Sequence, residues 1–192
     1  SNGAVSFSST IDNASATPRA LTISTGSGNV TLTGVVGGGA NGALDAIVIN
    51  STGTTAFSAA VTAASVTTNT GGTTTLGGNV TTTGAQTYSD AVSLTGNVVL
   101  NAPSITTAST IAAGSNNLTI TTDALSLGSN ITGTGALVIQ PKTNSTSIAI
   151  GSSAAGALAL SDTVLTYIND HFSSITIGSS TGTAAIGIDY AA

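Results

Sequence analysis

The chain has 192 residues, of which only 5% are charged, and its formal net charge is −5. Its cations are Arg19 and Lys142 alone, so the sequence offers no basic surface for a nucleic acid or an anionic membrane. No run approaches the roughly 18 apolar residues of a membrane span. The absence of cysteine excludes disulfides and thiolate chemistry. We therefore expect neither nucleic-acid binding nor membrane insertion.

Small polar residues dominate the composition. Thr, Ser, Gly and Asn supply 100 of the 192 residues, whereas aromatic residues make up 3%. Disordered chains are usually highly charged, which this chain is not. We expect an ordered chain whose thin core is distributed along its length. The lack of cysteine is compatible with an oxidising exterior, and the sequence looks like a processed or excised piece of a longer exported chain.

Short strands are predicted wherever two apolar residues stand two positions apart, because this period is typical of a half-buried strand. In chain order the pairs are Val5 and Phe7, Leu21 and Ile23, Val30 and Leu32, Ile47 and Ile49, Val92 and Leu94, Val98 and Leu100, Leu118 and Ile120, Leu125 and Leu127, Leu137 and Ile139, Ile148 and Ile150, Leu158 and Leu160, Ile175 and Ile177, and Ile186 and Ile188. Clusters of Gly, Asn, Ser and Asp between them favour tight turns.

The strands recur at a nearly constant distance in the sequence. Leu118, Leu137, Leu158 and Ile175 begin strands at intervals of roughly 20 residues. This spacing fits one coil of a parallel β-solenoid that consists of three short strands and their turns. We therefore predict an all-β fold, a single-stranded parallel β-solenoid of roughly ten coils that runs through residues 1–192 as one continuous unit.

Asparagine followed by an aliphatic residue recurs along the chain. The positions are Asn29, Asn79, Asn97, Asn117 and Asn130, and the middle three follow one another at nearly the interval of one coil. Stacked asparagine side chains can hydrogen-bond to one another along the axis of a cross-β stack. These five residues are the candidates for a structural ladder.

One segment, residues 161–172, departs from the strand pattern. Val164, Leu165, Ile168 and Phe172 fall on one face of a helix there, and Ser161 or Asp162 could cap its start. We predict a short helix or helical turn that ends a module or lies across the side of the solenoid.

The stretches Val5–Asp12, Gly28–Gly34 and Thr82–Leu94 share a pattern of short apolar and small polar residues. They resemble the repeats of very large bacterial surface proteins of the filamentous haemagglutinin type, and Phe172–Gly178 is similar to a recurring module end in those proteins. The resemblance covers most of the chain. It implies a right-handed parallel β-helix, secretion, and a role as stalk, fibre or adhesive surface. It assigns no functional residue, and the characteristic amino-terminal secretion domain of that family is not in this sequence.

Catalytic chemistry has little support in the sequence. Asp90 and Asp123 are the carboxylates to consider if a cleft joins them, although turn and cap positions are the plainer explanation. Asp170 and His171 form the one place where an acid adjoins an imidazole, and a histidine near a helix end is again the plainer interpretation. The nonapeptide repeats that bind calcium in other β-solenoids are missing. We predict no catalytic residue, no cofactor and no metal site.

Thr-x-Thr triplets suggest a binding face. In Thr31-Leu32-Thr33 and Thr119-Ile120-Thr121 both hydroxyls would face outward, as on flat ice-binding surfaces, but such a face needs a triplet on every successive coil. The leading hypothesis is a non-enzymatic structural or adhesive segment of an exported bacterial surface fibre, at the cell surface, which contacts other copies, adjoining repeats of the same chain, or a host, cell or glycan surface. The alternative is a β-solenoid that binds ice or carbohydrate.

Overall fold

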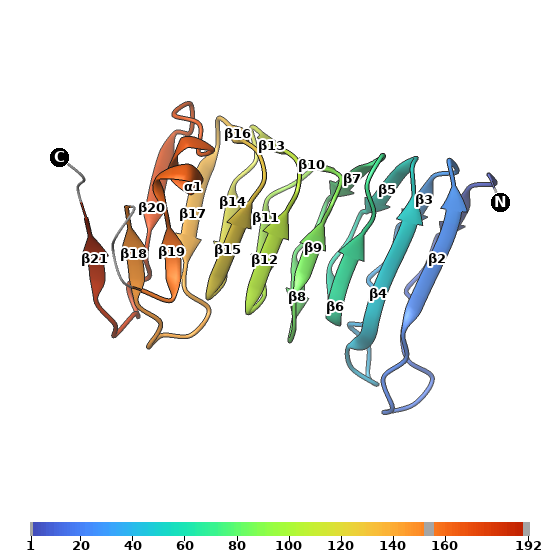
Figure 1. The fold of residues 1–192 in the computed structure, drawn as a ribbon. Helices are drawn as coiled ribbons and strands as arrows, with labels where there is room; N and C mark the ends of the chain where they lie inside the picture. The colour runs from blue at the N-terminus through green and yellow to red at the C-terminus, as the bar shows by residue number, and fades with distance from the viewer. Residues whose placement is uncertain (1, 152–155, 190–192) are drawn as a thin grey trace.

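The computed structural model describes residues 2–151 and 156–189 of the chain. The described part is built almost entirely of short parallel strands that follow one another along one direction of the molecule (Figure 1). The prediction of an all-β fold with parallel pairing is therefore confirmed.

The first of three sheets has seven strands, and we call it row A. Its strands, in spatial and chain order, are β1 (Val5–Phe7), β3 (Val30–Leu32), β5 (Thr54–Phe57), β7 (Thr73–Leu76), β10 (Ala91–Leu94), β13 (Ile111–Gly114) and β16 (Ile131–Gly133). All neighbours in row A are parallel.

The second sheet has eleven strands and divides into two rows, because the long strand β6 (Val61–Thr68) pairs with a different strand at each of its ends. Row B contains β8 (Val80–Thr82), β11 (Val98–Asn101), β14 (Leu118–Thr121), β17 (Ala136–Gln140) and β20 (Ser174–Ile177). Row C contains β2 (Leu21–Gly26), β4 (Leu44–Ser51), β9 (Gln86–Tyr88), β12 (Ser104–Thr107) and β15 (Ala124–Leu127). Isolated bridges from Ile11 to Val36 and from Val36 to Val61 extend row B toward the N-terminus.

The chain visits rows A, B and C in turn and then returns to row A beside its previous strand. In the middle of the chain Thr74 pairs with Val92, and Val92 with Ile111, so each return takes roughly 20 residues, as predicted for one coil. The first two returns are longer, because Val5 pairs with Val30 and Val30 with Thr55. We call one visit to the three rows a layer. Row A holds seven strands, whereas about ten coils are predicted. The number is smaller because the first layers are longer than roughly 20 residues and because the chain leaves the regular order of rows after residue 140.

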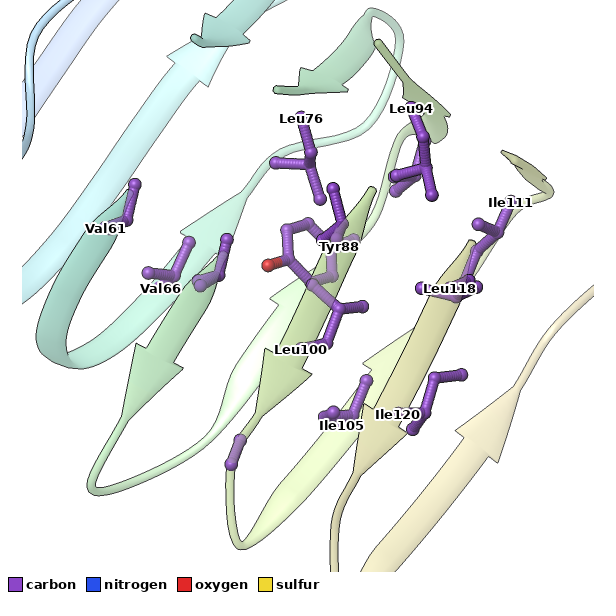
Figure 2. Close-up of a cluster of buried hydrophobic side chains, with 14 of the residues drawn as sticks. Val61, Val66, Leu76, Tyr88, Leu94, Leu100, Ile105, Ile111, Leu118 and Ile120 are labelled. Carbon is purple, nitrogen blue, oxygen red and sulfur yellow. The ribbon is translucent and has the colours of Figure 1, made fainter. Parts of the chain in front are cut away.

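Alternate residues of the strands fill the space between the rows. One continuous apolar cluster runs from Ile23 to Phe172, and its members are mostly Ile, Leu and Val. Figure 2 shows Leu76, Tyr88 and Leu100, which come from rows A, C and B, grouped in this interior. All strand pairs predicted from the apolar period lie in strands. The strands that the period misses include β7 and β9, whose inward positions carry Thr74 and Gln86.

The regular order of rows ends after β17. The third sheet contains β18 (Ile148–Ile150), β19 (Leu158–Leu160) and β21 (Ile186–Ile188), in the spatial order β19, β18, β21. Since β19 also contacts β15, the three strands continue row C, with β19 lying nearer to β15 than the earlier strand β18 does (Figure 1). The later strand β19 therefore lies between β15 and the earlier strand β18, and β21 then pairs with the other edge of β18.

The predicted helix is present but shorter than the predicted 161–172. The helix α1 spans Asp162–Thr166, and the Ser161 hydroxyl caps it by accepting a 3.4 Å hydrogen bond from the Val164 N–H. It ends there because Ile168 enters a parallel bridge with Ile131 of row A. Phe172 is buried over Gly133, where a Cβ atom would lie 2.6 Å from the Phe172 ring. Tertiary packing thus replaces the second turn of the predicted helix.

Candidate functional site

Three of the five ladder asparagines lie at the corner where the chain passes from row A to row B, directly before β8, β11 and β14. Their side-chain oxygens accept hydrogen bonds from backbone N–H groups of the next layer. Asn79 Oδ1 accepts from Val99, Asn97 Oδ1 from Asn117, and Asn117 Oδ1 from Ala136, each at 2.9 Å. These bonds run from side chain to backbone, so that each links one layer to the next.

Asn29 and Asn130 lie at another corner, between rows C and A. Asn29 Oδ1 accepts a 2.9 Å hydrogen bond from Thr54 N–H, which is the same type of link to the following layer. The Asn130 backbone carbonyl accepts from Ile111 N–H at 2.9 Å. The structure therefore brings Asn79, Asn97 and Asn117 into one stack and places the other two candidates apart from it.

Asp90 is also at the corner between rows C and A, and it points inward with 2% of its surface exposed. Its Oδ1 accepts a 2.9 Å hydrogen bond from Gly72 N–H, whereas its buried Oδ2 has no partner among the described residues. Burial raises the pKa of this carboxyl, and the bond from Gly72 offsets part of the rise.

Asp123 lies at the third corner, between rows B and C, so the structure does not join it to Asp90 in one cleft. Its Oδ1 accepts from Thr143 N–H at 2.9 Å and its Oδ2 from the Thr143 hydroxyl at 2.7 Å. Burial raises the pKa of Asp123, but the hydrogen bonds from Thr143, Thr146 and the Lys142 backbone together hold that pKa below its usual value. A carboxylate held ionised in this way ties the loop after β17 to the preceding layer.

Asp170 and His171 lie on the surface after α1. His171 Nε2 is 3.6 Å from Asp170 Oδ1, and the two side chains are 77% and 95% exposed. The described residues contain no group of three or more His, Cys, Asp or Glu that could hold a metal ion. None of the described helices is long and apolar enough to cross a membrane.

The interior contains a polar pair that the strand pattern does not predict. Gln86 and Tyr88 are fully buried neighbours on the inward side of β9. Gln86 Nε2 donates to the carbonyls of Val80 at 2.9 Å and Asn101 at 3.2 Å, and the Tyr88 hydroxyl donates to Gln86 Oε1 at 3.1 Å. The pair therefore connects row C to two strands of row B inside the core.

Lys142 extends back across several layers at the corner between rows B and C. Its Nζ donates to Asn101 Oδ1 at 2.6 Å and to the Thr82 carbonyl at 3.5 Å. These residues are 41 and 60 positions earlier in the chain. The lysine thus links the segment after β17 to the ends of β11 and β8.

Row C presents a column of small β-branched and hydroxyl side chains on its outer side. In successive strands the register stacks Thr22, Val48, Thr67, Thr87, Thr106 and Ser126. These residues alternate with buried ones along their strands. Neighbours in the column are about 4.8 Å apart, the usual distance between paired strands. The predicted triplets Thr31–Thr33 and Thr119–Thr121 lie on rows A and B instead.

Together these features place the chain among all-β proteins built on stacked parallel strands, with polar side chains at the corners linking the layers. A scan against models of protein families, a search of curated proteins and a search of solved structures give no match to this chain. The functional interpretation therefore depends on the geometry.

Proposed function

We propose that the chain is a right-handed, single-stranded parallel β-solenoid and a non-enzymatic structural or adhesive segment of an exported bacterial surface fibre. The observation that carries the proposal is the repeated order of rows A, B and C, with each strand paired to its equivalent one layer away. Elements that contact only their neighbours add length without adding width, which suits a stalk or fibre.

The links between layers support a mechanical role. Backbone hydrogen bonds of the parallel strands run along the long axis, and the asparagine stack adds a side-chain bond at three successive steps. The strands of row A carry no charged residue, so that no like charges meet at the spacing of the layers. Such a surface allows many layers to follow one another.

The final strands offer a place for further layers. Ile175 continues the inner column of Leu137, and Ile186 and Ile188 continue that of Ile148 and Ile150, yet they are 43%, 50% and 75% exposed. Apolar residues of an inner column are covered when another strand pairs with theirs. Adjoining repeats of the same chain, or another copy, would supply that strand.

Labelling of intact cells tests the location and the role. Antibodies raised against this chain should label the surface of unpermeabilised cells that produce it, on thin projections seen by electron microscopy. A cytoplasmic protein of the same cells serves as the control that must stay unlabelled. Labelling that requires permeabilisation would reject the proposal. A crystal structure of the chain tests the handedness separately, because a left-handed winding would reject the solenoid type and leave the location untouched.

The column on row C favours a second candidate, a β-solenoid that binds ice or carbohydrate through this face. Thr67, Thr87 and Thr106 stack without interruption, and a flat array of hydroxyl and methyl groups suits a crystalline surface. Thermal hysteresis measurements and binding to insoluble polysaccharides test this candidate. Activity that is lost in Thr87→Tyr and kept in the row A control Thr75→Tyr would support it, and the absence of both activities in the wild type would reject it.

A further inference from the structure

The buried side-chain oxygens that lack a protein partner are concentrated at one corner. Among the described residues they are Asp90 Oδ2 and four threonine hydroxyls. The threonines are Thr55, Thr68, Thr74 and Thr107, each at most 1% exposed.

The strand register places these groups around Asp90. Asp90 lies between the inward residues Tyr88 and Val92, on the passage from row C to row A. Tyr88 pairs with Thr68 in the layer before and with Thr107 in the layer after. Val92 pairs with Thr74, which in turn pairs with Thr55. All four threonines therefore flank the same corner over consecutive layers.

Within the part of the chain that the structure describes, no charged group compensates the Asp90 carboxyl. Tyr88 is the other titratable residue on the surrounding strands β5, β6, β7, β9, β10, β12 and β13, and its hydroxyl already donates to Gln86. The cation Lys142 is bound to Asn101 at another corner. Leaving buried polar atoms without partners costs about 1–3 kcal/mol each, so native proteins satisfy such atoms with protein groups or enclosed water.

We propose that this corner encloses ordered water molecules that hydrogen-bond Asp90 Oδ2 and the hydroxyls of Thr55, Thr68, Thr74 and Thr107. Water fits the chemistry because it donates to a carboxylate and accepts from a hydroxyl at the same time. A cation would take the oxygens as ligands but leave the hydroxyl protons without acceptors. Calcium also prefers six to eight oxygen ligands with several carboxylates, and this corner has one carboxylate. The enclosed water connects three layers of the chain from inside and does not depend on the proposed role as a fibre.

Isosteric threonine-to-valine variants test the proposal by the sign of the change in stability. Thr74→Val and Thr107→Val replace a hydroxyl with a methyl group. The matched controls are Thr82→Val and Thr122→Val, whose hydroxyls donate to the carbonyls of Gly84 at 2.7 Å and Ala124 at 2.9 Å. We expect all four variants to lower the midpoint of thermal unfolding by about 2–4 °C. A midpoint that is unchanged or raised in Thr74→Val and Thr107→Val would mean a dry corner and would overturn the proposal.

A count of enclosed water gives a second readout. Oxygen-17 relaxation dispersion detects water molecules that stay in a protein for long times. The wild type should hold more of them than the double variant Thr74→Val/Thr107→Val, whereas Thr82→Val/Thr122→Val should match the wild type. Equal counts in all three proteins would contradict enclosed water. A further experiment exchanges sodium chloride for choline chloride. If this exchange lowered the midpoint of thermal unfolding of the wild type and Asp90→Asn abolished the effect, the corner would hold a cation and the proposal of enclosed water would be rejected.

Discussion

The Tyr88 hydroxyl donates a 3.1 Å hydrogen bond to Gln86 Oε1 inside the core, while Gln86 Nε2 reaches the backbone of row B. Two polar side chains of one strand thus satisfy each other and two backbone carbonyls at a depth where the other side chains are mostly aliphatic. Because Gln86 and Tyr88 are fully buried, removing either side chain takes away the partner of a polar atom on the other.

Gln86→Leu should destabilise the fold by about 2–4 kcal/mol, since it removes the acceptor of the buried Tyr88 hydroxyl and the two bonds from Gln86 Nε2 to row B. Chemical denaturation of the wild type, Gln86→Leu, Tyr88→Phe and the double variant measures the coupling. We expect the double variant to be less destabilised than the sum of the single ones by about 1 kcal/mol. Strict additivity would contradict the coupled pair.

Asp90 should make the protein less stable at neutral pH than in acid. Its pKa is raised in the folded state, so its contribution to stability is complete below the unfolded value of 3.8 and is lost as the pH rises through the folded pKa. Asp90→Asn removes this loss of stability, because asparagine does not ionise. We therefore expect Asp90→Asn to have a higher midpoint of thermal unfolding than the wild type at pH 7, and the difference between the two midpoints to become smaller toward pH 3.

Asp123 provides the matched control of opposite sign. Its pKa is lowered, so its contribution is present above 3.8 and is lost as the pH falls through the folded pKa. Asp123→Asn should lower the midpoint at pH 7 and approach the wild type at pH 3. The same sign in both variants would show that neither carboxyl acts through its own titration.

The asparagine stack should contribute stability at each step. Asn97→Ala and Asn117→Ala each remove the acceptor of one backbone N–H of the next layer, and we expect each to cost about 0.5–1.5 kcal/mol in urea denaturation. Asn144→Ala is the control, because this side chain is exposed and the hydrogen bond from Thr183 goes to the Asn144 backbone carbonyl. We expect Asn144→Ala to lower the free energy of unfolding by less than about 0.5 kcal/mol. If Asn97→Ala and Asn117→Ala lowered the free energy of unfolding no more than Asn144→Ala does, the stack would have no structural role.

Gly133→Ala should be destabilising because the added Cβ would lie 2.6 Å from the Phe172 ring and 3.0 Å from Ala113 Cβ. Overpacking of this kind costs about 1–3 kcal/mol. Phe172→Leu in the same chain should recover part of the loss by making room. If the double variant is less stable than Gly133→Ala alone, the clash with Phe172 is not the cause.

The period of two predicts those strands whose inward residues are aliphatic, such as Val98–Leu100 and Leu118–Ile120. It fails at β7 and β9, where threonine, glutamine and tyrosine occupy the inward positions. Gln86 is buried here because its amide group donates to the Val80 and Asn101 carbonyls of row B, and a local pattern contains no information about those partners. The predicted helix is too long for a similar reason, since Ile168 pairs with Ile131 of row A.

Some residues of the candidate sites can be found from the sequence pattern, and others only from the structure. Asn79, Asn97 and Asn117 could be found from their recurrence, because a side chain that links neighbouring layers repeats with the layers. Asp90 stands two positions from both Tyr88 and Val92, a spacing that indicates an inward side chain. Lys142 has no repeat, and its contacts with Asn101 and Thr82 bridge 41 and 60 residues, so only the three-dimensional structure reveals them.

The position of Lys142 also gives the molecule a chemical reporter. Lysine occurs once in the chain, and its ammonium group is occupied by Asn101 Oδ1 at 2.6 Å. An acylating reagent that modifies lysine must wait until this contact opens, so the rate of labelling measures how often the segment after β17 separates from Asn101 at the end of β11. One side chain can thereby follow the loosening of the stack in real time, without any introduced probe.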